Sequence, residues 1–152
     1  MPVTMQQVLA EIDKDEPNYT TIAELGPDAL PHLQMIADTN DPLRASKAAY
    51  GASLIGGPGA IDILKKAGDH SDAQVRVAVA HALRNLATTA PSELVMKSLG
   101  DQDAGVRKLA LGTAGLLKRA EFNQRISAIA QNDPDEHIRK RAQTTARQLN
   151  IR

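Results

Sequence analysis

The sequence repeats with a period of about 31 residues, and this periodicity restricts the chain to a small group of folds. Four arginines, each directly after an apolar residue, mark the repeat at spacings of 32, 31 and 32 residues. The positions one before and three, seven and ten after each arginine hold small or apolar residues, with Lys47 as the single exception. At roughly 100° per residue these positions share one sector of a helix. The repeat therefore predicts four helices with the same buried stripe. The marking arginines are Arg44, Arg76, Arg107 and Arg139.

A shorter apolar segment precedes each of these helices, and turn-forming residues such as Gly26-Pro27 and Ala90-Pro91 set it off. The repeating unit is thus a helix, a tight turn and a second helix. One such pair cannot bury its own apolar stripe, so the pairs must stack, and we predict an all-α solenoid of about five antiparallel pairs. We expect a single domain over 1–152, in which residues 1–26 lack the arginine and form an N-terminal capping pair. The predicted repeats are 27–56, 57–88, 89–119 and 120–152.

The composition is consistent with a core of small side chains. The chain has 24 alanines, three aromatic residues and no Trp, which favours closely packed helices over a β-sandwich. The absence of Cys excludes disulfides, thiolate nucleophiles and metal sites built on thiolates. No apolar run approaches 18 residues, and the N-terminus does not resemble a signal peptide. We therefore expect no membrane segment and a cytoplasmic protein.

The predicted second helices carry start signals. Asp41-Pro42 and Asp133-Pro134 place an N-cap acceptor before a proline at the first helical position, and Asp72 and Asp103 can cap their own helices. The last helix differs on one flank, where Arg141 and Thr145 replace the small or apolar residues of the interior repeats. We interpret this flank as the polar outer face of a terminal cap, which predicts a complete small solenoid.

The pattern Asp-x-x-Val-Arg, followed by Ala and Leu at helical spacing, resembles HEAT repeats over about residues 27–151. The segment 54–64, with 72–76 after it, is similar to the short bacterial form named after the phycobilisome lyases. The resemblance implies a right-handed α-solenoid of scaffold or binding type, and less often an enzyme. It also implies an Asp/Arg ladder between adjacent repeats; a row of phosphate-binding arginines is the alternative. The ladder residues would be Asp41, Arg44, Asp72, Arg76, Asp103, Arg107, Asp135 and Arg139.

The net charge of zero hides a gradient along the chain. Residues 1–41 hold eight acids and one base, whereas 42–152 hold 10 acids and 17 bases. Such segregation either reflects drift in surface composition or indicates a charge-complementary partner or weak head-to-tail self-association.

Few residues form a catalytic or metal-binding pattern. The four histidines show no His-x-x-x-His or His-Glu-x-x-His spacing, and the single Glu136-His137 pair reverses the His-Glu pairs of HEAT-like hydroxylases. His70, Ser71 and Asp72 supply the residue types of a triad, but we interpret Ser71 and Asp72 as cap residues. We therefore expect no catalytic site, no metal, no cofactor and a protein that is not an enzyme.

The second helices present a face opposite their buried stripe. On the HEAT plan this face lines the concave side, and here it changes from small residues (Ala45, Ala49, Ala52) to basic ones. Mid-helix glycine costs about 0.8–1 kcal/mol against Ala, so two glycines on this face indicate either close approach of a partner or tight packing within the solenoid. The predicted partner-binding residues are His81, Arg84, Lys108, Gly112, Gly115, Lys140, Thr144 and Arg147.

Three functions are consistent with this sequence. The leading hypothesis is a non-catalytic interaction or scaffold module that binds an acidic or extended segment of a protein partner on its concave face. The first alternative is nucleic-acid binding by the basic C-terminal half, against which the zero net charge and the scarcity of stacking aromatics argue. The second is bilin-lyase-like cofactor handling, which requires a roomy apolar cleft with basic residues for the propionates of a tetrapyrrole.

Overall fold

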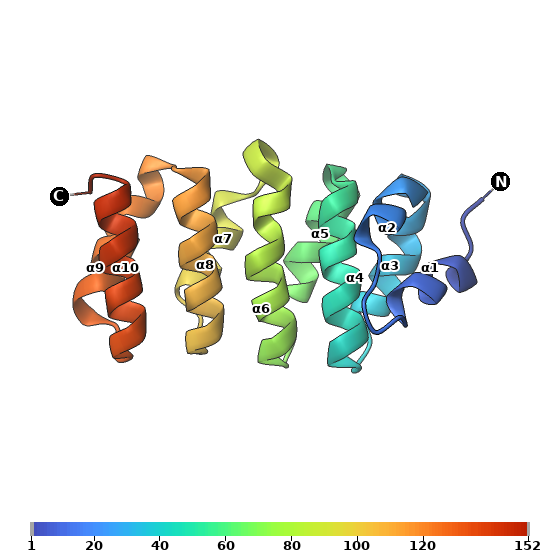
Figure 1. The fold of residues 1–152 in the computed structure, drawn as a ribbon, viewed down its shortest axis with the longest axis horizontal. Coiled ribbons are helices and arrows are strands. Elements are labelled where there is room, and N and C mark those ends of the chain that lie inside the picture. The colour runs from blue at the N-terminus through green and yellow to red at the C-terminus, as the bar shows by residue number, and fades with distance from the viewer. Residues whose placement is uncertain (1, 152) are drawn as a thin grey trace.

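The computed structural model describes residues 2–151, and the regular secondary structure within that range is all helical (Figure 1). This confirms the predicted all-α fold. No helix there is long and apolar enough to cross a membrane. The α-helices are α1 (Met5–Ile12), α2 (Tyr19–Leu25), α3 (Leu30–Ala37), α4 (Pro42–Ile55), α5 (Gly57–Ala67), α6 (Ala73–Ala82), α7 (Ser92–Leu99), α8 (Ala104–Leu117), α9 (Asn123–Asn132) and α10 (Glu136–Gln148). Short 3-10 helices are η1 (Pro27–Ala29), η2 (Leu83–Thr89) and η3 (Ala120–Phe122).

The helices stack in sequence order as an α-solenoid. Figure 1 shows α4, α6, α8 and α10 side by side in one layer, and α3, α5, α7 and α9 behind them. Each helix of the front layer packs against the next, and the N- and C-terminal ends lie at opposite ends of the stack. The division into one domain with repeats at 27–56, 57–88, 89–119 and 120–152 stays a prediction.

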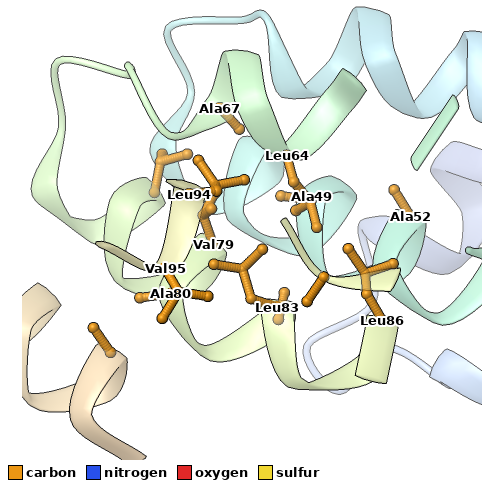
Figure 2. Close-up of a cluster of buried hydrophobic side chains, with 14 of the residues drawn as sticks. Ala49, Ala52, Leu64, Ala67, Val79, Ala80, Leu83, Leu86, Leu94 and Val95 are labelled. Atoms are coloured by element: carbon orange, nitrogen blue, oxygen red, sulfur yellow. The ribbon is translucent and has the colours of Figure 1, made fainter. Parts of the chain in front are cut away.

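Alanines fill the contacts between neighbouring pairs. Figure 2 shows Ala49, Ala52 and Ala80 of the front-layer helices among leucines and valines of α5, α6, η2 and α7. All three alanines are fully buried. Small side chains at these positions let the backbones of adjacent helices approach closely, which explains the alanine-rich composition.

The first repeat departs from the predicted concave face. Ala45, Ala49 and Ala52 were expected on that face, but they are buried. They are covered because α4 packs closely against α6, and Figure 2 shows Ala49 and Ala52 among side chains of α5, α6, η2 and α7. The helix α2 also packs against α4, at the predicted buried stripe, where Ile22 Cγ2 lies only 3.0 Å from the position that a Cβ on Gly51 would take. The N-terminal pair therefore covers this end of the front layer.

Lys47, the one break in the buried stripe, joins the N-terminal pair to the repeats. Its Nζ donates to the carbonyl oxygens of Ile12 (3.1 Å) and Lys14 (2.8 Å), at the C-terminal end of α1. Helix-terminal carbonyls lack partners within their own helix, and a cation is favoured there.

The helix caps are largely as predicted. Asp41, Asp72 and Asp103 accept hydrogen bonds from backbone N–H groups in the first turns of α4, α6 and α8. The start predicted for the last helix is wrong by two residues: α10 begins at Glu136, and Asp135 is its cap. Asp133 has another role.

The arginine ladder exists, but its acids differ from the predicted ones. Arg76 Nε donates to Asp101 Oδ2 (2.9 Å), and Arg107 Nε and Nη2 donate to Asp133 Oδ2 and Oδ1 (2.8 and 3.0 Å). Each of these acids lies in the loop before the next second helix, two residues ahead of its cap. The predicted acids Asp72, Asp103 and Asp135 cap helices. The arginines instead bind Asp101 and Asp133.

The two ends of the ladder break the pattern. Position 70, equivalent to Asp101, holds His70, which accepts from the N–H of Asp72 and contacts the Thr39 carbonyl. Arg44 instead donates to Asp13 through Nε and Nη2 (both 2.8 Å), while its predicted partner Asp41 caps α4 and lies 3.8 Å away. At the other end, Arg139 donates to the carbonyl oxygen of Asp133 (2.6 Å). These bonds support the ladder interpretation over a phosphate-binding row.

Asp133 gives the fold a specific pH dependence. Burial alone would raise the pKa of Asp133, but hydrogen bonds from Arg107 and from the N–H of Asp135, together with the charges of Arg107 and Arg139, outweigh it and lower the pKa from 3.8. A carboxyl with a lowered folded-state pKa stabilises fully above its unfolded pKa, and this contribution is lost as the pH falls below it. We expect urea unfolding between about pH 5 and about pH 2.5 to show a larger stability loss for the wild type than for Asp133→Asn. Parallel pH profiles for the two proteins would contradict this.

Candidate functional site

A cleft opens between α8 and α10, near the C-terminal ends of both helices. Its volume is about 510 Å³. It has an apolar component from leucines and a basic component from three cations. The lining residues are Arg84, Leu111, Gly112, Gly115, Leu116, Lys118, Arg141, Thr144, Thr145, Gln148 and Leu149. We refer to this set as the cleft.

Two arginines from different repeats converge on Gly112. A Cβ at Gly112 would lie 3.2 Å from Arg84 Nη2 and 3.6 Å from Arg141 Nη2. Arg84 Nε is held by the His81 carbonyl oxygen (3.1 Å). In the part of the chain that the structure describes, neither guanidinium forms an ion pair with a carboxylate. This arginine pair is therefore available to an oxyanion of a ligand, for which the planar guanidinium is well suited.

The floor and rim of the cleft are apolar and open. Gly112 and Gly115 leave part of α8 without side chains, and the buried Leu111 lies beside them. Leu116 is 59% exposed at the edge of the cleft, so it offers apolar surface there. Lys118 adds a third cation where α8 ends, in the left-handed region with φ 55°. The cleft thus combines an apolar surface with three positive charges.

Arg141 and Thr145 create the cleft rather than an outer cap face. Both were expected to point away from the stack, but they face α8: Thr145 Cγ2 lies 3.5 Å from the Cβ position of Gly115, and Arg141 reaches Gly112. In the preceding repeats the equivalent flank packs inward, and Thr113 Oγ1 donates to the Ala80 carbonyl (2.6 Å). The long Arg141 side chain cannot fill the same space compactly, so the contact between α8 and α10 opens.

The structure brings only half of the predicted partner-binding residues together. Arg84, Gly112, Gly115 and Thr144 line the cleft. His81 lies beside Arg84 and stacks on Tyr50. The other three do not line the cleft: Lys108 is exposed on α8, Lys140 is exposed and pairs with Glu136 (3.2 Å), and Arg147 lines a separate groove with Ala146 and Ile151.

Four polar residues of the cleft were not among the predicted partner-binding residues: Lys118, Arg141, Thr145 and Gln148. Arg141 carried a usable signal, because a cation replaces the small or apolar residue of the other repeats on the flank that faces the preceding helix. Lys118 carried a weaker one as a basic residue at a helix C-terminus. Among residues 2–151 no group of three or more His, Asp or Glu side chains is arranged to hold a metal ion.

Gly112 should make the fold less stable than an alanine would, while it leaves room for the Arg84 guanidinium in the cleft. We expect Gly112→Ala to raise the free energy of unfolding by up to about 1 kcal/mol, since alanine is the better helix former and Arg84 is flexible enough to move. The same change should weaken binding in the cleft, because the new methyl displaces the Arg84 guanidinium. Thermal unfolding and a ligand titration measure the two effects. Gly115→Ala, whose Cβ meets Thr145 at an ordinary 3.5 Å, is the matched control for stability.

The comparisons with known proteins identify the fold. No protein-family model matches the chain, and no curated protein matches its sequence. Among solved structures, a chain of the complex of CpcE and CpcF of phycocyanin lyase from Nostoc sp. PCC7120 matches with a TM-score of 0.75 at 20% identity. The match covers 93% of this chain and 96% of that chain. This chain shares the α-solenoid fold of that structure. The resemblance inferred from the repeat is thereby confirmed for the fold.

This likeness corrects one expectation. The absence of catalytic motifs led to the expectation that the protein is not an enzyme, but the matched chain belongs to the complex of a phycocyanin lyase, which points against that expectation.

Proposed function

We propose that this solenoid is a lyase-type, bilin-handling protein that holds a linear tetrapyrrole in the cleft between α8 and α10 and works with a protein partner. The observation that carries the proposal is the match to the phycocyanin lyase complex over nearly the whole of both chains. The cleft is an independent reason, because it combines apolar surface with basic residues, and a tetrapyrrole with its propionates needs both.

The chemistry of the cleft fits a bilin. A linear tetrapyrrole has a long apolar ring system and two propionates. Leu116 and Leu149 offer an apolar surface, and the arginine pair offers bidentate partners for a propionate. Lys118, which lines the cleft where α8 ends, can balance the second carboxylate. Sites for small ligands commonly combine apolar surface with a few fixed polar groups.

The proposed partner is a protein that meets the exposed cations of the front layer. The matched structure is a complex of two proteins, CpcE and CpcF. Lys108, Lys140 and Arg147 are exposed outside the cleft, where they are suited to an acidic or extended segment. Charged residues at the edge of a protein–protein interface chiefly affect the rate of association and its salt dependence. A cytoplasmic location remains part of the proposal.

An absorption titration tests the proposed function. We expect biliverdin, a linear tetrapyrrole with two propionates, to change its visible absorption spectrum when the protein is added, with saturation at one equivalent. The chain has no Trp and no Cys, so neither an indole transition nor a thiol adduct complicates the spectrum. An unchanged spectrum at high protein concentration would reject the proposal.

A further inference from the structure

Aromatic side chains are scarce in this chain, yet they gather at one place. Of the three Phe, Trp and Tyr residues, Tyr19 and Tyr50 lie with their ring centroids 4.8 Å apart in an edge-to-face arrangement. The Tyr50 ring is also nearly parallel to the imidazole of His81, at 5.7 Å and 18°. All three side chains are half-buried. We refer to Tyr19, Tyr50 and His81 as the aromatic row; it crosses from α2 over α4 to α6.

The aromatic row leads directly to the cleft. His81 at the end of the row contacts Arg84, whose Nε donates to the His81 carbonyl oxygen (3.1 Å). Arg84 in turn approaches Gly112 on the floor of the cleft, opposite Arg141. The rings of the aromatic row are thus linked to the arginine pair through His81 and Arg84, although none of the three rings lines the cleft itself.

The imidazole is kept in the form that favours stacking. Burial, and next the positive charge of Arg84, lower the pKa of His81 from 6.5, so the ring is neutral near pH 7. A neutral imidazole does not repel Arg84 and presents an apolar face. Its Nδ1 is buried without a hydrogen-bond partner among the described residues, so the ring is held by packing against Tyr50 rather than by a polar contact.

We propose that Tyr50 and His81 form a stacking platform for one conjugated ring of the tetrapyrrole whose propionate binds Arg84 and Arg141. The inference rests on the proposed function and extends its site from the cleft to α4 and α6. Two nearly parallel, half-buried rings beside unpaired guanidinium groups match a ligand that is flat and apolar along its length and anionic at its edge. Planar π-systems gain from offset stacking beyond the area that they bury.

The test combines affinity with ring signals in NMR spectra. We expect Tyr50→Leu to weaken biliverdin binding about tenfold, and Tyr50→Phe, which keeps the ring, to change it less than about twofold. In aromatic 1H–13C spectra of the wild type, the signals of Tyr50 and His81 should shift on binding. Phe122 is fully buried and outside the row, so its signals are the internal reference. Circular dichroism of both variants controls for folding.

The outcomes separate this inference from the proposed function. An unchanged biliverdin spectrum with the wild type rejects the proposed function and this inference with it. A spectral change together with wild-type affinity in Tyr50→Leu and unmoved Tyr50 and His81 signals overturns the platform alone. Weaker binding by Tyr50→Leu, near-normal binding by Tyr50→Phe and shifted ring signals support it.

Discussion

Replacing Asp133 by asparagine should lower the free energy of unfolding by about 3–5 kcal/mol, because it leaves Arg107 as a buried charge without its counter-ion. Asp133 and Arg107 are only 6% and 9% exposed. Two hydrogen bonds join them, and Asp133 Oδ1 also accepts from the N–H of Asp135 (2.9 Å). The pair links the loop before α10 to α8, so its loss should loosen the last helix pair first. Urea unfolding followed by circular dichroism measures the loss.

Asp13→Asn is the matched control for this ion pair. Asp13 and Arg44 form the equivalent bidentate contact at the other end of the ladder, but both side chains are over 40% exposed. Exposed pairs are screened by water and contribute little, so this variant should unfold close to the wild type. Equal stability losses in Asp13→Asn and Asp133→Asn would contradict the role given to burial.

Removing both guanidinium groups from the cleft, in the double variant Arg84→Ala and Arg141→Ala, should weaken biliverdin binding by at least about a hundredfold. Hydrogen bonds to charged groups contribute about 1.5–3 kcal/mol each, and about 1.4 kcal/mol corresponds to a factor of ten. The fold should persist, since Arg84 is held by one backbone carbonyl and Arg141 lies at the open contact between α8 and α10. Absorption titration gives the dissociation constant.

A second double variant removes the same charge outside the cleft. Lys140→Ala with Arg147→Ala takes two cations from α10, and neither residue lines the cleft. Its affinity for biliverdin should stay within a few-fold of the wild type and should converge on it at high salt, where distant charges are screened. Comparable losses in the two double variants would show that net charge, and not the arginine pair, holds the ligand.

The fold was predictable because its determinants are local and repeated. The marking arginines and the apolar stripe recur at helical spacing, and the N-cap aspartates Asp41, Asp72 and Asp103 act within three residues of their own position. Such signals can be recognised without knowing which residues of the neighbouring repeat pack against them. The alanine content had the same origin, since each repeat needs the same close contact.

The site depends on relations between repeats, and these are harder to predict. Arg141 was correctly recognised as unlike its equivalents, but which neighbour its flank faces is settled by the packing of α10 on α8. The ladder acids were misassigned because the loops before α8 and α10 each hold two aspartates separated by two positions, and only the folded loop shows which one caps and which one binds arginine. Similarly, the burial of Ala45, Ala49 and Ala52 could not be deduced without knowing how closely α6 packs against α4.

Amide NMR mapping can show whether the cleft between α8 and α10 is the ligand site. On addition of biliverdin to the 15N-labelled protein, we expect the amide signals of Gly112 and Gly115 to shift most among the glycines. Gly26 and Gly56, at turns of the N-terminal half, should not move. Shifts that concentrate in α1 to α3, or that leave Gly112 and Gly115 unchanged while the absorption spectrum responds, would place the ligand outside the cleft.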